Sequence, residues 1–456
     1  MRRKMEAVLS FESSDNGLPK VIRDYRARYR AISQVLDDNP EILSAVHQDL
    51  LTLSEGDSSG REGDYTSENI LRALLVQHLE GLPFREAVIR IRIGSDPFLQ
   101  DFARMRKRAV MDFTFLDRCF LVIRPATWRW VNQLLGRYGV AEEMVSPNVI
   151  RTDTTVVEAN IHYPTDASLL WDTWRVASRL LAQAREIFSE SCPHRFHERK
   201  IKRLYLYVTR YMPSKSESRQ RQVKAAFRTL IERTAWIVAI AEEFCVQAAS
   251  RDNSALAAVA LELKAYLPSM KKIVTTASRA QIEGETVPAS DRVFSLFEQH
   301  SELIKRGRRE KPVEFGHKVL LCQTVEKFIT DYEVFEKQLA DCDLTESVIQ
   351  RHEKLFGTRP EVLAADKGFC PAEAKFQELA EQVDTLAIPR RMRDFVDKVL
   401  AYWQAFRAGI EGTISGLKRA FRLIRCFFRG FRSFSAAVGL GVFCHNLIVL
   451  AEYEPD

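Results

Sequence analysis

The chain of 456 residues lacks the features of several protein classes. Its eight cysteines show no CxxC spacing, which argues against a disulfide framework and indicates reduced thiols in a cytoplasmic protein. It contains no glycine-rich nucleotide-binding loop and no glycine-framed serine nucleophile. The first residues, MRRKMEAVLSFESSDNGLPK, include no apolar stretch of the kind found in secretion signals. These absences disfavour secreted proteins, dinucleotide-dependent enzymes and serine hydrolases.

The chain also has little net charge and one long apolar run. Lysine and arginine number 67 against 61 aspartate and glutamate, a net charge of +6, so any nucleic-acid surface must come from local clusters. Hydrophobic residues make up 46% and charged residues 28%, as in ordinary globular proteins. The apolar run from Phe434 to Ala451 is diluted by polar residues such as Ser435 and Asn446. We therefore expect it to be a buried core helix, with no membrane association.

The first 145 residues show helical periodicity throughout. Two amphipathic segments flank Gly81, with Thr66 or Ser67 as a cap and Pro83 at the start of the second segment. This layout is typical of a helix–turn–helix, and a basic cluster follows at residues 104–108. Two packed helices with a charged edge would give the same pattern. If the region binds DNA, the expected groove or phosphate contacts and backbone contacts come from Arg85, Arg90, Arg92, Arg106 and Lys107.

Residues 168–312 are expected to form an all-helical insertion. Between Arg195 and Lys224 there are ten basic residues against two glutamates, with three tyrosines (Tyr205, Tyr207 and Tyr211) among them. Basic groups of this kind hold phosphates while aromatic rings stack on bases, although a solvated helical face would look the same. The sequence KRGRREK (305–311) is expected to be an exposed loop. Cys192, His194 and His197 could bind zinc, but no second pair has suitable spacing.

The remaining segments alternate strands with helices. A strand rich in β-branched residues contains Asp153, and further strands are expected at 314–324, 327–337, near 360–369 and at 384–389. Helices are expected at 343–357, 371–383 and, as one long basic helix, 390–425. The result is a mixed five-stranded sheet. With the insertion removed, the order β-β-β-α-β-α-β-α is typical of a ribonuclease-H-like fold.

Three acids occupy equivalent-looking positions in this order. Asp153 lies in the first strand, Asp366 at the end of the fourth strand, and Glu411 in the final helix. Such a fold would bring them to one crevice, where hard oxygen ligands hold Mg²⁺, with Mn²⁺ able to substitute, for in-line phosphoryl transfer. The competing interpretation is three unrelated structural acids. Other acids fit the order less well: Glu353, Glu361, Glu373, Glu158, Asp166 and Asp172.

At these motifs the sequence resembles the DDE transposases of bacterial insertion sequences, above all the ISNCY group. The matching segments are DTTVVEANIHYPTDASLLWD (153–172), LAADKGF (363–369) and RAGIEGTISGLKRAF (407–421). In the last segment, Arg407, Glu411 and Lys418 match the R-x3-E-x6-K spacing of such transposases. The related signature has a tyrosine where this chain has Gln404, so the resemblance implies no tyrosine function there, such as handling a hairpin intermediate.

The resemblance implies an α+β protein that cuts and joins DNA. Its expected domains are a helical DNA-binding domain (1–145), a ribonuclease-H-like catalytic core (146–167 and 313–433), the helical insertion (168–312) and a helical C-terminus (434–456). Asp153, Asp366 and Glu411 would be the catalytic metal ligands, and Arg407 and Lys418 would contact DNA. The expected partners are terminal inverted repeats, target DNA and further copies of the chain in a dimer or higher oligomer. Two alternatives remain: a non-catalytic DNA-binding protein descended from a transposase, and another ribonuclease-H-like nuclease such as a junction resolvase.

Overall fold

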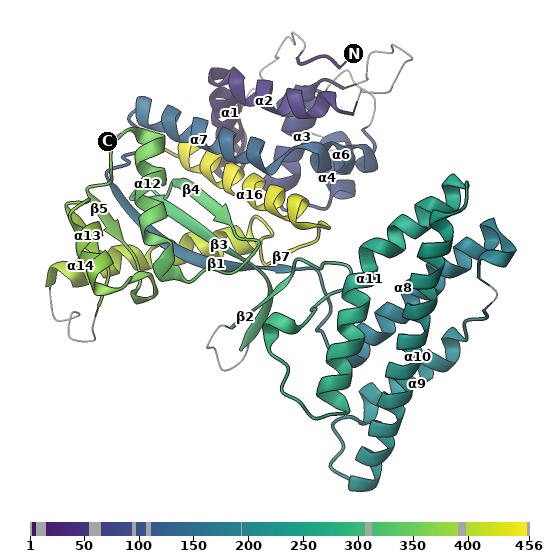
Figure 1. The fold of residues 1–456 in the computed structure, drawn as a ribbon. Coiled ribbons are helices and arrows are strands. Elements are labelled where there is room, and N and C mark those ends of the chain that lie inside the picture. The colour runs from purple at the N-terminus through teal and green to yellow at the C-terminus, as the bar shows by residue number, and fades with distance from the viewer. Residues whose placement is uncertain are drawn as a thin grey trace. The chain divides into compact units, whose positions relative to one another are not determined.

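The computed structural model describes residues 2–5, 15–53, 65–93, 97–105, 111–192, 194–305, 312–390 and 398–453. The chain is a mixed α/β protein, rich in helix, with a seven-stranded mixed sheet (Figure 1). It divides into two compact units. The first combines Met1–Ala159 with Gly316–Asp456, and the second is Asn160–Phe315. The helical N-terminal segment expected as a separate domain thus shares a unit with most of the sheet.

The sheet is built around β1 (Val149–Ala159), which lies antiparallel to β3 (Val313–Thr324) and parallel to β5 (Val362–Ala364). The strand order is β2-β3-β1-β5-β6, with β4 (Ile329–Val334) on β3 and β7 on β1. All five expected strands are present, since β6 (Thr385–Ala387) pairs in parallel with β5. The expected number of strands was nevertheless too low. Two short strands, β2 (Glu302–Lys305) and β7 (Arg425–Cys426), had too few residues to show a period in the sequence.

One face of the first unit's strands is covered by the N-terminal helices and the last helix. Figure 1 shows α7 and α16 lying over this face. The helices are α1 (Lys20–Asp38), α2 (Pro40–Leu51), α3 (Ser67–Leu79), α4 (Phe84–Ile93), α5 (Phe98–Phe102), α6 (Phe113–Val122), α7 (Pro125–Ala141) and α16 (Phe431–Ala451). They share one apolar core with strand residues Val157, Val319 and Leu321. Helix α16 is long and apolar enough to cross a membrane, but 78% of its apolar window is buried inside the structure, as a core helix would be.

The helix–turn–helix layout forms where the sequence predicts it. Thr66 caps α3 through a capping box with Asn69. Gly81 adopts φ 60°, a left-handed conformation that favours glycine, and α4 begins directly after Pro83. Every residue of α3 from Ser67 to His78 is buried. This helix is therefore a core element and not an exposed reader of DNA.

The opposite face of the sheet carries α12 (Thr345–Phe356) and α13 (Glu373–Ala380). They pack on alternate strand residues such as Ile150, Leu320 and Leu363. Gly357 ends α12 at φ 80°, as the sequence predicts. Two short 3-10 turns lie at the ends of strands on this side, η3 (Asp341–Asp343) and η4 (Lys367–Phe369).

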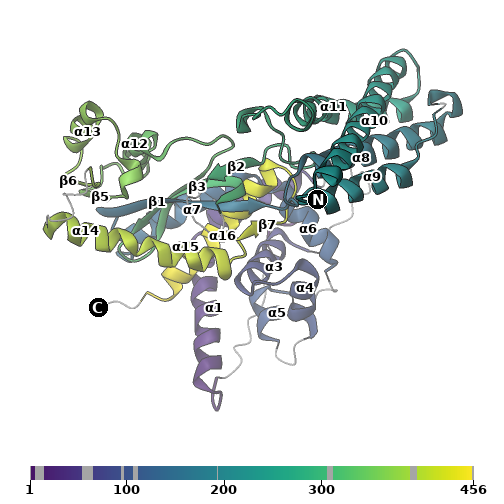
Figure 2. The ribbon, with the colours of Figure 1, turned by 90° about the horizontal axis from the view of Figure 1, so that it is seen from below.

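The single long helix expected at 390–425 was wrong. Two helices occur in the described part, α14 (Lys398–Ala408) and α15 (Ile410–Arg419), and the chain is non-helical beyond them until β7. Figure 2 shows both helices following β1. The break has a physical cause, because Nη1 of Arg151 on β1 donates to the carbonyl oxygen of Phe406 at 2.7 Å. Gly409 leaves room for this guanidinium, because a Cβ added at position 409 would clash with Arg151 Nη1.

The second unit is mostly helical, but the expectation of an all-helical insertion was wrong, because β2 (Glu302–Lys305) lies within it. It contains α8 (Asp166–Ile187), α9 (Glu198–Tyr211), α10 (Glu217–Ala249) and α11 (Ser254–Gln281), with the short turns η1 (Ser189–Ser191) and η2 (Ala289–Asp291). Buried residues including Trp174, Phe227 and Leu263 form its own apolar core. A core independent of the sheet explains how this long segment interrupts the order of strands.

Candidate active site

Asp153 on β1 and Asp366 just after β5 lie at equivalent distances beyond the pairing of these two parallel strands. The last register pair of β1 and β5 joins Arg151 to Ala364, and each aspartate lies two residues further along its own chain. Adjacent strands are about 4.8 Å apart, and in-register residues of parallel strands face the same side. Asp366 comes after the end of β5, where its Oδ1 accepts a hydrogen bond from the Gly368 amide at 2.8 Å. The sheet thus brings these two predicted acids together.

Asp153 is half-buried and its charge is unfavourably placed. Burial raises the pKa of its carboxyl to about 6, and the nearby charges of Asp366 and Asp341 act in the same direction. Two donors oppose this rise. The Thr154 amide donates to Oδ1 at 2.7 Å, and Arg407 Nη1 donates to Oδ2 at 3.3 Å. The strand therefore holds a carboxylate that needs positive charge beside it.

Arg407 links Asp153 to Glu411. Its Nη1 lies 3.3 Å from Asp153 Oδ2 and 3.7 Å from Glu411 Oε1, so both carboxylates lie beside the same cationic atom. The Arg407 side chain is 17% exposed, whereas that of Glu411 is 67% exposed. Three competing acids pair elsewhere in the structure: Glu353 with Arg359, Glu361 with Asn148, and Glu373 with Arg390.

A further acid, Asp341, belongs to this cluster, and the sequence reasoning missed it. Its Oδ1 accepts hydrogen bonds from Thr154 Oγ1 at 3.1 Å and from Lys318 Nζ at 3.0 Å. A Cβ added to Gly368 would lie 3.0 Å from Asp366 Oδ1 and 3.6 Å from Asp341 Oδ2, so both carboxylates border this glycine. Asp341 lies in the turn η3, where no periodic pattern marks its neighbours. Only the folded chain reveals its position.

A network of buried polar groups fixes the helices that carry Arg407 and Glu411. Arg151 Nε donates to Gln323 Oε1 at 2.8 Å, and Gln323 Nε2 donates to Thr413 Oγ1 at 2.6 Å. The Arg151 guanidinium also lies 4.7 Å from the centre of the Phe406 ring. Strands β1 and β3 therefore hold both sides of the break at Gly409.

Gln404 has a structural part in this arrangement. Its Nε2 donates to the carbonyl oxygen of Ala365 at 3.0 Å and to that of Ala387 at 2.9 Å. These two bonds attach α14 to the ends of β5 and β6, next to Asp366. Gln404, which replaces the tyrosine of the related signature, thus positions α14 beside the acidic cluster.

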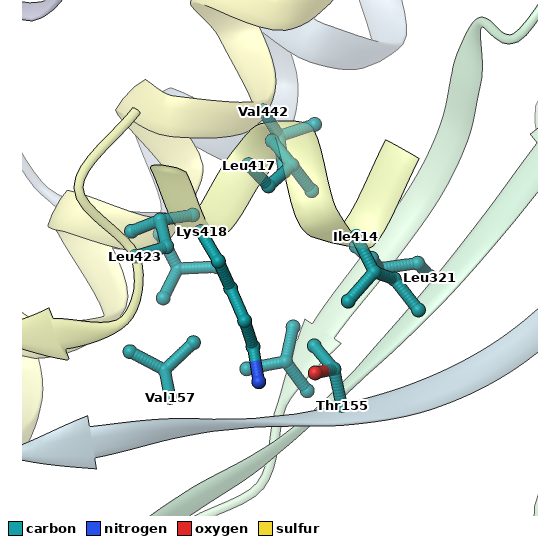
Figure 3. Close-up of a pocket in the computed structure, with 10 residues that line it drawn as sticks. Thr155, Val157, Leu321, Ile414, Leu417, Lys418, Leu423 and Val442 are labelled. Carbon is teal, nitrogen blue, oxygen red and sulfur yellow. The ribbon is translucent and has the colours of Figure 1, made fainter. Parts of the chain in front are cut away.

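Lys418 points toward the sheet. Figure 3 shows its side chain lying between α15 and β1, beside Thr155 and Val157. It borders a small void of about 10 Å³ that is lined mainly by apolar residues such as Ile414 and Leu417. A contact between Lys418 and DNA remains a prediction, and the ammonium would have to leave this position to make it.

The acidic cluster fits a divalent cation in its chemistry. In the described part of the chain, no group of three or more histidine, cysteine, aspartate or glutamate side chains stands ready to hold a metal ion. Asp153 and Asp366 nevertheless converge, and a guanidinium already stands between Asp153 and Glu411. Hard carboxylate oxygens are the ligands that Mg²⁺ prefers. The two aspartates would hold such an ion, with Glu411 beside Arg407 and Asp341 beside Gly368 as candidate further donors.

The acids that follow the first strand have partners of their own. Glu158 receives a hydrogen bond from Arg425 at 3.0 Å in the first unit. In the second unit, Asp166 pairs with Arg292 at 3.0 Å and Asp172 with Arg175 at 3.1 Å. Glu158, Asp166 and Asp172 therefore form structural ion pairs and do not belong to the acidic cluster.

Of the five N-terminal residues expected to bind DNA, three lie on one helix. Arg85, Arg90 and Arg92 are exposed on α4, and the Arg85 guanidinium lies 4.7 Å from the centre of the Phe113 ring. Arg106 and Lys107 lie outside the described residues.

Most of the basic KRGRREK loop (305–311) is also outside the described residues.

In the second unit, the tyrosines that lie among the basic residues of 195–224 have aromatic or cationic neighbours. Tyr205 stacks on Trp171 at 5.9 Å, and Arg219 lies 4.4 Å over Tyr211. Part of the ring surface of Tyr205 and Tyr211 is therefore already in contact with residues of the same unit.

Comparison with known proteins gives no match, whether to a family model, a curated protein or a solved structure. The function of the chain is therefore argued from the acidic cluster and its surroundings.

Proposed function

We propose that this protein is a transposase of the DDE type, with a ribonuclease-H-like catalytic core, that cuts and joins DNA at the ends of an insertion sequence. The observation that carries the proposal is that Asp153 and Asp366 each lie two residues beyond the last register pair, Arg151 and Ala364, of two adjacent parallel strands. Glu411 joins them from the helix side through Arg407. The order β4-β3-β1-β5-β6 supports the fold, because it puts the Asp153 strand at the centre beside the Asp366 strand.

The chemistry follows from the residues. When bound, Mg²⁺ activates the attacking oxygen and stabilises the leaving oxygen of an in-line phosphoryl transfer. Asp153 and Asp366 would hold it, and Asp153 must lose its proton to do so. Because the pKa of this carboxyl is raised to about 6, protons compete for it at mildly acidic pH. Arg407 keeps a positive charge beside the carboxylates and can donate to a phosphate oxygen.

The test uses the full chain and DNA that carries the terminal repeats, identified by sequencing the DNA on both sides of the gene. With Mg²⁺ or Mn²⁺, the wild type should cleave at the repeat ends. Asp153→Asn, Asp366→Asn and Glu411→Gln should abolish cleavage and leave DNA binding nearly intact, since affinity comes mainly from phosphate neutralisation elsewhere. The control is Glu353→Gln, because that acid pairs with Arg359 away from the cluster.

Other outcomes separate the alternatives. Near-normal cleavage by any of the three variants would refute the role of that residue. If the wild type binds the ends without cutting in either metal, it is a DNA-binding protein that no longer catalyses. Metal-dependent cutting with no preference for the ends would indicate a different ribonuclease-H-like nuclease.

A further inference from the structure

A cavity of about 650 Å³ lies within the first unit, away from the acidic cluster. Its walls come from α3, α4 and α6 on one side, and on the other from the segment 421–429, which follows α15, together with the start of α16. Its volume falls within the range of roughly 300–1,000 Å³ typical of small-molecule sites. Nothing in the proposed phosphoryl transfer requires this cavity, so its lining calls for a separate explanation.

Aromatic rings dominate the lining. Phe120 and Phe428 pack with ring centres 4.3 Å apart, and Phe84 lies 6.3 Å and 6.0 Å from them. These three rings pack against one another and form one wall of the cavity. Phe427, in contrast, is 61% exposed at the cavity, and Phe421 stacks on His78 with ring centres 6.0 Å apart and 14° between planes. Flat aromatic surfaces of this kind favour a planar ring as ligand.

The lining is also positively charged. Arg422, Arg425 and Arg429 line the cavity, and one acid, Asp117, lies with them. Burial raises the pKa of the Asp117 carboxyl, which opposes its negative charge. Arg425 bonds to Glu158, whereas Arg422 and Arg429 are exposed and form no ion pair within the described residues. Two guanidinium groups are therefore available to an anion.

His78 adds a buried polar group to the wall of the cavity. It is 6% exposed and lines the cavity, yet its Nε2 has no hydrogen-bond partner among the described residues. A buried polar atom without a partner is rare in native proteins. Burial, helped by the charge of Arg422, lowers the pKa of His78 to about 4, so its imidazole is neutral near pH 7. Its Nε2 is closed off from the cavity, and a Cβ added to Gly441 would lie 3.3 Å from it, so His78 contributes its ring and no hydrogen bond to the wall.

We propose that this cavity binds a nucleotide. The base would lie against Phe427 near His78, and the phosphate would meet Arg422 and Arg429. A simple aliphatic anion would use the arginines but would gain little from the flat rings. Two sources share this chemistry, a free nucleotide and an unpaired nucleotide of a bound DNA strand. The inference does not depend on the acidic cluster, because binding needs neither metal nor cleavage.

The first measurement is calorimetric binding of deoxyadenosine monophosphate, deoxyadenosine and inorganic phosphate to the full chain without divalent metal. Phe427→Ala should weaken binding of the monophosphate by about tenfold or more, as loss of base stacking does. Arg429→Ala should weaken it by about fivefold and leave deoxyadenosine unaffected, since an exposed charge contact is worth little more. The matched controls are Ile424→Ala, also exposed in the same segment, and Arg419→Ala; neither residue lines the cavity.

The second measurement separates the two sources. A labelled duplex ending in one unpaired adenosine is compared with the same duplex ending in an abasic site. If DNA supplies the nucleotide, the unpaired base should raise affinity, and Phe427→Ala should remove that gain. If the ligand is a free nucleotide, the monophosphate binds and the two duplexes bind alike.

The proposal is overturned if neither the monophosphate nor the unpaired base is bound. It is also overturned if Phe427→Ala and Arg429→Ala, shown by circular dichroism to be folded, bind as the wild type does. A failure of DNA cleavage would sink the proposed transposase function and leave these binding results unchanged.

Discussion

Replacing Asp153 by asparagine should stabilise the protein when no divalent metal is present. The pKa of this carboxyl rises from 3.8 to about 6 on folding, chiefly through burial. Between these values the folded chain keeps a proton that the unfolded chain has released, so the free energy of unfolding falls as pH rises from about 4 to about 6. At about 1.36 kcal/mol per pH unit, the loss is about 3 kcal/mol at pH 8. The asparagine side chain has no charge to bury, so the free energy of unfolding of the Asp153→Asn variant does not fall with pH in this way.

The assay is urea unfolding of the full chain in a metal chelator, followed by circular dichroism from pH 4 to pH 8. The variant's advantage should grow across the window from pH 4 to pH 6 and then level off. Asp384→Asn, at an exposed position, should show no such pH-dependent gain. Adding Mg²⁺ should stabilise the wild type and not the variant, because only the carboxylate binds the ion. The reasoning fails if Asp153→Asn lowers stability at pH 8 or if its effect does not change with pH.

Three further predictions concern the helices beside the cluster. Gly409→Ala should lower the free energy of unfolding by about 1–3 kcal/mol, because the added Cβ would clash with the Arg151 guanidinium. Gly412→Ala, where an added Cβ would meet nothing within 4 Å, should be neutral or slightly stabilising. Thermal unfolding of both variants tests this prediction. Arg151→Met should lower the cleavage rate constant on the order of tenfold to 100-fold with unchanged DNA affinity, because it positions the helix that carries Arg407; equal losses in both quantities would contradict this. Lys418→Met should leave the salt dependence of DNA binding unchanged if the ammonium stays over β1, while a slope lower by about one phosphate contact would show that it moves to DNA.

The order of strands and the two aspartates could be predicted because their signals are local. Runs of β-branched residues marked β1, and glycines marked the turn at Gly81 and the end of α12 at Gly357. Parallel pairing then follows from the alternation of strands with helices. The register between β1 and β5, which leaves Asp153 and Asp366 each two residues beyond the last pair, is seen only in the folded chain.

The break between α14 and α15 could not be predicted, because its cause lies far away in the sequence. Helical periodicity continues through Gly409, and the residue that interrupts the hydrogen bonding is Arg151 on β1. The same holds for Asp341, whose role depends on Thr154 and Lys318 bringing its turn to the strand ends. Long-range contacts of this kind leave no periodic trace in the segments that they change.

The shared core of the first unit changes how DNA recognition must be tested. A fragment of residues 1–145 would lose the contacts of α1, α3 and α7 with α16 and of α7 with β4, and so would expose a large apolar surface. Failure of such a fragment to bind DNA would therefore report misfolding as readily as lack of affinity. Since α3 is buried, α4 is the element of the pair that can approach DNA, through exposed Arg85, Arg90 and Arg92. Substitution of these three arginines in the full chain, with Arg199 and Lys202 of α9 as the comparison set, tests which unit would recognise DNA ends in the proposed function. Loss of end preference in the first set alone would assign recognition to α4, and loss in the second set alone would assign it to the helical insertion.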